Sequence, residues 1–421
     1  MRFWGDGSKG ILFFYWVLLF WVPIPLGSNR AWSAALLEVW VLVLLMAWMA
    51  GFMSGRYPVS PTLVRARAIW YCATAWLVFV WLQLLPIPIE LLGLISPEAA
   101  HAYRQAAAPD AVGWAPLTLD RQATLEGACK TTAYIAFFAL SLFLLNTRDR
   151  IRTTTYVLIF SGVFQALYGV FSSYQGGVPA SGTYVNRNHY AGYLEMCLSV
   201  GIGVLMASLS GERNETWGHF FRRMVQWMIS PKMGLRLLLV TMVIALVLSR
   251  SRMGNSAFFV SLFATGIIGL MLSRHATRSM VVLLISLMVI DVAIVGTYFG
   301  AERVVERISD TSMQTEDRDE VAGYALRMWR DYPLLGAGLG AFGVVFPRYS
   351  ADGTNGTYTH AHNDFFEFGA ETGLLGLILL GFMVGSSLLV ALRAQYLCRD
   401  PVLRGISFAA LMGILSLMIH S

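Results

Sequence analysis

Charged residues are scarce in this sequence. Only 13% of its 421 residues are Asp, Glu, Lys or Arg, and 56% are hydrophobic. An average soluble domain has about 25% charged residues, so the composition excludes an ordinary soluble enzyme, a disordered chain and a protein with a nucleic-acid-binding tail. Because the apolar residues come in long runs, we expect one polytopic membrane domain rather than several globular domains.

Lysine is scarce, and the cysteines are not arranged in pairs. Only three of the 31 basic residues are Lys, and the other 28 are Arg. Arg grips phosphate in a two-pronged fork, so the bias is a weak indication of phosphate chemistry, although a GC-rich genome explains it equally well. The four cysteines lie in or beside apolar runs without a CxxC pair. We therefore expect neither a disulfide framework nor a zinc site.

Eleven apolar runs approach the length of about 20 residues that a membrane-spanning helix needs. They predict an all-α, polytopic transmembrane bundle of about 11–12 spans. We expect the first run to be a retained span, because no small-x-small cleavage site follows it. The runs lie at residues 10–27, 31–53, 68–92, 131–146, 153–172, 189–209, 235–249, 255–273, 279–300, 373–392 and 405–421.

The distribution of basic residues predicts the orientation of these spans. With the N-terminus inside, 18 Lys or Arg residues fall in inner segments and seven in short outer segments, while six lie in one long outer loop. We expect three regions: transmembrane helices with short loops over 1–300, the outer loop over 301–372, and C-terminal transmembrane helices over 373–421. A smaller outer segment, 96–128, is expected to cover part of the outer surface.

The loop at 301–372 is the one soluble-looking segment, and it holds 12 of the 25 acidic residues. Its residues 318–331 predict an amphipathic helix that ends before Pro333, with Arg327 and Arg330 away from the apolar face. That face comprises Val321, Tyr324, Ala325, Met328 and Trp329.

Two further segments of this loop are apolar or rich in glycine. Residues 339–349 carry aromatic and apolar side chains, which favours a segment that lies at the membrane interface. The glycines at 336, 338 and 340 resemble a phosphate loop, but no strand precedes them. We therefore expect a re-entrant turn against the bilayer.

Three arginines contradict the orientation bias, because they lie at the outer ends of spans. Arg187 precedes one span, and Arg250 and Arg252 share a very short turn between two others. Binding of lipid headgroups would explain any single one of them. Two arginines in one tight turn can converge on a diphosphate, and the N-terminus of the following helix adds positive potential.

Polar residues surround Arg187 and extend into the following span. We expect Asn186, Asn188 and His189 to support Arg187, and Glu195, two turns farther on, to hold an arginine in place. Acidic residues within spans are also candidates for ion or proton relays. These candidates are Glu38, Glu195 and Asp291.

A second polar cluster opens the span at 373. His360 and His362 are followed by Asn363 and Asp364, and then by Glu367 and Glu371. The histidines could be metal ligands or fill a core or capping role, but no tight ligand spacing such as H-E-x-x-H is present. A general base at the outer membrane surface fits better, since His titrates near neutral pH and can take a proton from a sugar hydroxyl.

Taken in this order, the motifs resemble the O-antigen ligase family, whose members share the Wzy-C domain. The resemblance covers residues 160–392 and depends on the Asn186–His189 segment, the Ser-Arg-Ser-Arg turn, residues 330–338, and His362 followed by Gly373. The family's ligase motif is a His, ten residues and then a Gly, which His362 fits and His360 does not. The family also has an Arg followed four residues later by Leu at the start of a span. Here Ser256 stands at that spacing after Arg252, and Arg330 precedes Leu334 at that spacing but within the outer loop.

The resemblance implies a transferase of the GT-C type at the periplasmic face of the bacterial inner membrane. The donor would be a glycan on undecaprenyl diphosphate, and the acceptor would be the lipid A–core oligosaccharide, or another glycan in a polymerase. His362 would deprotonate the acceptor, supported by His360 and Asn363, and the reaction would invert the anomeric centre without a metal or cofactor. The diphosphate would be bound by Arg187, Arg250, Arg252 and Arg330.

A transporter or flippase is the alternative from another class of protein. Transporters place functional charges near the bilayer midplane and often contain a repeat of their two halves. Here the unusual charges gather at one surface and no repeat is visible. The expected partners are therefore membrane lipids, a lipid-linked donor and a glycan acceptor, and no nucleic acid.

Overall fold

The structure is a computed structural model of the chain, and it describes residues 7–58, 61–106, 113–209, 231–272, 321–350, 359–361 and 363–421. These residues are almost entirely helical. Seven described helices are long and apolar enough to cross a membrane, and three shorter ones are also apolar. The all-α, multi-pass membrane fold expected from the apolar runs is confirmed. The predicted span at 279–300, which contains Asp291, lies outside the described residues.

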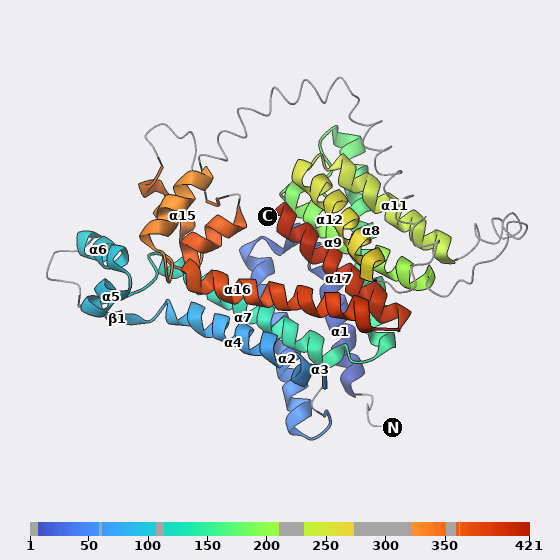
Figure 1. Cartoon of the computed structure of the whole chain (residues 1–421), viewed down its shortest axis with the longest axis horizontal. Coiled ribbons are helices and arrows are strands. Elements are labelled where there is room, and N and C mark those ends of the chain that lie inside the picture. Colours follow the sequence, from blue (N-terminus) through green and yellow to red (C-terminus); the bar gives the residue numbers. More distant parts are fainter. Residues whose placement is uncertain are drawn as a thin grey trace, which may run out of the picture. The chain divides into compact units, whose positions relative to one another are not determined.

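The contacts divide the chain into two compact units, which are described separately (Figure 1). The first unit is formed by Met1–Ser60, Ser141–Ala301 and Ser387–His420. Its described helices are α1 (Gly7–Trp21), α2 (Ala31–Met53), α8 (Arg148–Gly176), α9 (Arg187–Leu209), α11 (Pro231–Leu248), α12 (Arg252–Leu272) and α17 (Pro401–His420), with a 3-10 turn at Leu26–Ser28.

The core of the first unit lies among α8, α9, α11, α12 and α17, which pack side by side (Figure 1). Helices α9 and α17 are antiparallel, because Gly203 meets Gly405 near one end while Glu195 meets His420 near the other. A Cβ atom at either of these glycines would overlap the backbone of the other helix. Small residues allow such close approach, which is how transmembrane helices gain packing without a hydrophobic driving force.

The second unit is formed by Pro61–Leu140 and Glu302–Ser386. It contains α3 (Pro61–Arg65), α4 (Arg67–Leu82), α5 (Ile89–Ile95), α6 (Pro97–Ala106), α7 (Arg121–Leu144, whose last residues belong to the first unit), a helix at 321–331, α15 (Phe342–Val345) with a 3-10 turn at Phe346–Arg348, and the first part of α16 (Asp364–Leu397). Strands β1 (Pro86–Pro88) and β2 (Trp114–Pro116) pair antiparallel, with Ile87 opposite Ala115.

The helix predicted for 318–331 is confirmed over its described residues, 321–331, and it ends before Pro333. Val321, Ala325 and Met328 are buried, and Tyr324 and Trp329 pack against the same core. Arg327 and Arg330 are exposed. The helix buries this face against α5, α6 and β2, so the two outer segments of the sequence form one hydrophobic core.

Two expectations about this region were wrong. Most apolar side chains of the segment 339–349 do not lie at an interface, since Phe342, Val345 and Phe346 are at most 2% exposed within that core, and Val344, at 59%, is the exception. The predicted span at 68–92 ends at Leu82, because Pro86 and Pro88 lack the N–H groups that a helix needs and form a strand instead. Helix α7 also begins earlier than the predicted span at 131.

The glycine-rich segment turns inside the protein rather than against lipid. Gly336, Gly338 and Gly340 all have positive φ angles, and Ala337 is fully buried. The N–H groups of Ala337 and Gly338 donate to the carbonyl oxygens of residues 370 and 371, each over 2.9 Å. These carbonyl groups are available because α16 is interrupted at Gly373, where φ is 62° and ψ is −167°.

Gln83 joins this turn to the end of α4. Its side-chain amide donates to the carbonyl oxygen of Leu335 over 3.1 Å and accepts from the N–H of Leu339 over 3.1 Å. Glu371 is also buried, and its carboxylate accepts from the N–H of Phe342 over 3.1 Å. Residues from three distant parts of the sequence thus hold the start of α16, where the histidine cluster lies.

Candidate functional site

The Asn186–His189 segment is the capped start of α9. The side-chain oxygen of Asn186 accepts from the N–H of Asn188 over 2.8 Å, and its carbonyl oxygen accepts from the N–H of Tyr190 over 3.1 Å. Asn is among the best N-cap residues because its side chain satisfies an N–H that has no partner within the helix. Arg187 is the first residue of α9, and both Arg187 and His189 are exposed.

The Ser-Arg-Ser-Arg turn connects α11 to α12. Ser251 caps α12, because its hydroxyl oxygen accepts from the N–H of Gly254 over 3.2 Å. The Ser249 hydroxyl donates to the carbonyl oxygen of Leu246 over 2.6 Å and accepts from the N–H of Ser251 over 3.2 Å. Arg252 is the first residue of α12 and is exposed. The turn between two spans is therefore held by its own serines.

Arg250 has a backbone conformation that is uncommon for a residue with a side chain. Its φ angle is 54°, in the left-handed region. A long side chain is strained there by about 1–2 kcal/mol, and such strain is often found at functional sites. This strain is a structural reason to treat Arg250 as a candidate functional residue.

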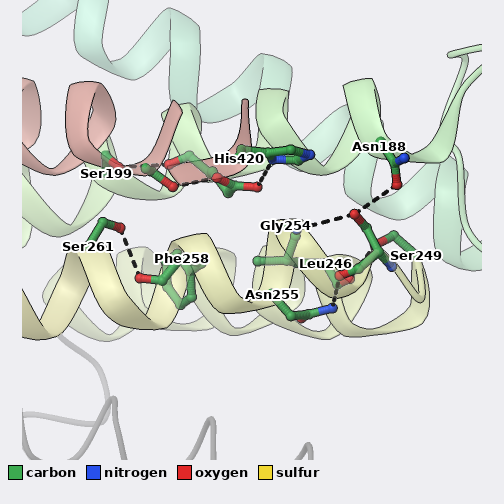
Figure 2. A network of polar contacts seen from close by, with 12 residues as sticks. Asn188, Ser199, Leu246, Ser249, Gly254, Asn255, Phe258, Ser261 and His420 are labelled. Carbon is green, nitrogen blue, oxygen red and sulfur yellow. Dashed lines mark hydrogen bonds and ion pairs between the residues drawn. The ribbon is translucent and has the colours of Figure 1, made fainter. Parts of the chain in front are cut away.

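One hydrogen bond joins the two arginine-bearing helix starts. The Ser251 hydroxyl donates to the side-chain oxygen of Asn188 over 2.9 Å (Figure 2). The N-termini of α9 and α12 therefore lie next to each other, and the segments they start carry Arg187, Arg250 and Arg252. Each helix N-terminus has a partial positive charge, which adds to the charge of the guanidinium groups. The combination is suited to binding an anion with several oxygens.

A buried carboxylate lies two turns below Asn188 on α9. Glu195 is fully buried, and one of its oxygens is 2.7 Å from the ring Nδ1 of His420. The hydroxyl of Ser416 donates to the other oxygen (Figure 2). A Cβ atom at Gly254 would lie only 3.0 Å from the carboxylate, so the cap of α12 packs directly against it.

This carboxylate had been singled out in the sequence, but its partners had not. A lone Glu in an apolar run is a visible signal, whereas His420 is 225 residues away and nothing local connects the two. Their contact exists because α9 and α17 are antiparallel. Glu195 thus bonds α17 through His420 and Ser416 and packs against the start of α12 at Gly254. No local motif in the sequence indicates these contacts.

The histidine cluster at the start of α16 belongs to the second unit, and Glu367 organises it. One carboxylate oxygen of Glu367 is 2.7 Å from Nδ1 of His360, and the other accepts from the N–H of Ala361 over 2.7 Å. Asn363 caps α16, since its side-chain oxygen accepts from the N–H groups of residues 365 and 366 over 3.1 and 3.2 Å. His362, the predicted base, lies outside the described residues, but both of its neighbours are held.

Sequence reasoning missed the role of Glu367. The residue stands seven positions after His360 and one helical turn inside α16, so its carboxylate can reach back over the helix start. An acidic residue in the first turn of a helix is the available signal, because carboxylates there commonly bond the preceding backbone. The capping role left open for a histidine is filled by Asn363 instead.

The pKa of His360 gives a direct test of this arrangement. The hydrogen bond to Glu367 raises the pKa of His360 above its ordinary value of 6.5, and partial burial opposes the rise. The contact therefore stabilises the fold fully below pH 6.5, and this contribution is lost as the pH rises through the raised pKa. We expect Glu367→Gln to lower the pKa of His360 toward 6.5, measured by NMR of protein with labelled histidine rings.

The neighbouring Asp364 provides a control for that measurement. Its negative charge makes the smallest of the contributions that raise the pKa of His360. Asp364→Asn should therefore lower the pKa less than Glu367→Gln does, and a His360→Gln variant identifies the resonance. An unchanged His360 pKa in Glu367→Gln would show that the hydrogen bond does not form in solution.

Two further features concern the predicted site residues: the place of Arg330 and the arrangement of possible metal ligands. Arg330 is exposed at the end of the helix at 321–331, beside Asp331, which accepts from the Tyr349 hydroxyl over 2.7 Å. Among the described residues, no group of three or more His, Cys, Asp or Glu side chains is arranged to hold a metal ion.

Comparison with known proteins agrees with these features. A family model described as O-Antigen ligase matches residues 237–381, which include the turn that carries Arg250 and Arg252, the glycine-rich turn and the histidine cluster. The Asn186–His189 segment precedes the matched region. The comparison with curated proteins finds no match. The resemblance inferred from the motifs is thereby confirmed for residues 237–381, and the chain is a multi-pass membrane protein in which this region matches the O-antigen ligase family.

Proposed function

We propose that this protein transfers a glycan from undecaprenyl diphosphate to the lipid A–core oligosaccharide. The family domain supports a membrane glycosyltransferase of the ligase or polymerase type. The observation that carries the proposal further is the hydrogen bond between Asn188 and Ser251, because it joins two helix N-termini that carry arginines. We place this activity at the periplasmic face of the inner membrane, on a scaffold of the GT-C type.

The proposed chemistry is an inverting substitution at the anomeric carbon. The acceptor hydroxyl oxygen forms a bond to that carbon while the bond from the carbon to the diphosphate oxygen breaks. The electron pair of the broken bond leaves with undecaprenyl diphosphate, and the hydroxyl proton passes to the imidazole of His362. Arg187, Arg250, Arg252 and Arg330 stabilise the charge that develops on the diphosphate. The diphosphate is already a good leaving group, so the reaction needs no nucleotide.

Polymerisation of glycan repeat units is the alternative within the same chemistry. It differs only in the acceptor, which would be a second lipid-linked glycan. Ser256, four residues after Arg252, stands where the ligase pattern has Leu. This departure from the ligase pattern is the observation that favours a polymerase. The bond formed and the leaving group are the same in both reactions.

Reconstitution separates the two activities. The full chain in lipid vesicles is supplied with undecaprenyl-diphosphate-linked glycan, with and without lipid A–core. Appearance of glycan on lipid A–core supports the ligase, whereas growth of the lipid-linked glycan in both samples supports the polymerase. If neither product forms while the donor remains bound, the proposed transfer is wrong.

The arginine turn predicts a specific response to mutation. Arg252→Ala should lower the transfer rate about 10²–10³-fold if the guanidinium stabilises charge in the transition state. Arg252→Lys should be nearly as slow, because an ammonium group cannot form two parallel hydrogen bonds to a phosphate. Steady-state rates in vesicles test both variants, with Arg56→Lys, far along the chain, as the control. Full activity of Arg252→Lys would mean that only the positive charge matters.

A further inference from the structure

Helix α5 has apolar side chains on two faces. Ile89 and Leu92 point into the core of the second unit and are 5% and 0% exposed. Leu91, Leu94 and Ile95, at helical spacing i, i+3 and i+4, lie on another face and are 45%, 81% and 39% exposed. A helix that is apolar on more than one side is normally buried in a protein core or in a membrane. The exposed side of α5, which also carries Glu90, is therefore a candidate contact surface for apolar groups.

The strand pair beside α5 also has an exposed apolar side chain, and its backbone is bonded to the start of α5, since the N–H of Ile89 donates to the carbonyl oxygen of Gly113 over 3.1 Å. Trp114 of β2, opposite Pro88 of β1, is 66% exposed. We call these four side chains, Leu91, Leu94, Ile95 and Trp114, the α5 patch. Exposed apolar groups gathered in this way mark interaction sites in proteins. Tryptophan in particular is enriched where a membrane surface meets water, because its ring is apolar and its N–H is polar.

Helix α5 follows the apolar helix α4 in the chain, with strand β1 between them. Helix α4 is apolar but has only 16 residues, which corresponds to about 24 Å at 1.5 Å per residue. The hydrocarbon core of a bilayer is about 30 Å thick, so α4 alone is short for a crossing. Its last residues and Leu85, which follows, are exposed and apolar: Trp81 is 40%, Leu82 54% and Leu85 53% exposed. Strand β1 begins at Pro86, directly after them.

We propose that the α5 patch inserts into the interfacial layer of the bilayer, on the side where α4 ends. The occupant is the lipid surface itself, since exposed apolar side chains follow one another along the chain from the end of the apolar helix α4 through Leu85 to α5. In this arrangement α5 lies parallel to the membrane plane, with Ile89 and Leu92 toward the protein and Leu91, Leu94 and Ile95 toward the acyl chains. The core of the second unit, which holds the histidine cluster at the start of α16, is thereby fixed at the level of the lipid headgroups.

A fluorescent reporter on α5 tests the depth directly. We would introduce Leu94→Cys into a chain with Cys129→Ser and Cys398→Ser, because the other two cysteines, Cys72 and Cys197, are buried. The variant is labelled with an environment-sensitive fluorophore and placed in nanodiscs of phosphatidylcholine and phosphatidylglycerol. Gln105→Cys, on the exposed side of α6 in the same unit, is the matched control.

The expected result is a blue-shifted emission at position 94 that lipids with a nitroxide near the headgroup quench strongly and aqueous iodide quenches weakly. The control at position 105 should show the opposite accessibility. Equal quenching by iodide at both positions would overturn the proposal. A blue shift at 94 that lipid nitroxides do not quench would also overturn it, because protein, such as a second copy of the chain, would then cover the patch.

Discussion

Alanine at His362 is expected to abolish measurable glycan transfer while the protein still inserts into the membrane and binds its donor. A positioned general base contributes about 10²–10⁴-fold to a rate, so its loss removes the activity rather than weakening it. Position 362 itself lies outside the described residues, but the residues on either side of it are described. Glu367 holds the backbone N–H of Ala361, and Asn363 caps α16, so the main chain is fixed on both sides of position 362.

The matched control for this variant is His360→Ala. His360 is two residues away and is an exposed histidine bonded to Glu367, but it does not have the ligase spacing to Gly373. We expect it to lose much less activity, because Glu367 still holds Ala361. Transfer rates and donor binding, measured on the same vesicles, separate a lost base from a lost substrate. A fully active His362→Ala variant would remove the general-base assignment.

Gly336→Ala is expected to destabilise the second unit by about 3 kcal/mol or more, which is near the upper range for single substitutions. The φ angle at Gly336 is 74°, and a Cβ atom there would overlap the backbone of Glu371. Backbone cannot move aside as a flexible side chain does. The substitution would therefore displace the glycine-rich turn, and the hydrogen bonds from Ala337 and Gly338 to the carbonyl oxygens of residues 370 and 371, at the break in α16, would be lost.

The chain offers a control that separates backbone strain from the clash. Gly55 has nearly the same φ angle, 71°, but apart from its own chain neighbours no heavy atom lies within 4 Å of the position of a Cβ atom. Gly55→Ala should therefore cost only the strain of the left-handed conformation, about 1 kcal/mol. Thermal unfolding of both variants in nanodiscs, followed by circular dichroism, makes the comparison. Equal losses of stability would show that the contact with α16 is unimportant.

The helices themselves could be read from the sequence, because each must satisfy its own backbone hydrogen bonds wherever it lies in a membrane. The run at 31–53 coincides with α2, and the run at 189–209 falls on α9. The outer turn of arginines was also visible, since basic residues on the wrong side of the orientation bias need no structure to be noticed. The hydrogen bond from Ser251 to Asn188, 63 residues apart, was not visible.

The incorrect prediction for residues 339–349 arose because their apolar side chains pack in a protein core rather than against lipid. Hydropathy does not distinguish these two environments, because both remove the same side chains from water. Phe342 and Phe346 therefore indicated a membrane interface, whereas they pack under the helix at 321–331.

The sequence by itself determined that the chain is a bundle of membrane helices, which turns carry arginines, and which histidine has the ligase spacing. These properties depend on composition, order and local periodicity. Only the tertiary structure decided that Glu195 meets His420, that Gln83 holds the glycine-rich turn, and that this turn completes the hydrogen bonds at the break in α16. The contacts of Glu195 and Gln83 join residues more than 200 positions apart, and those of the glycine-rich turn join residues 33 apart, so only tertiary packing brings them together.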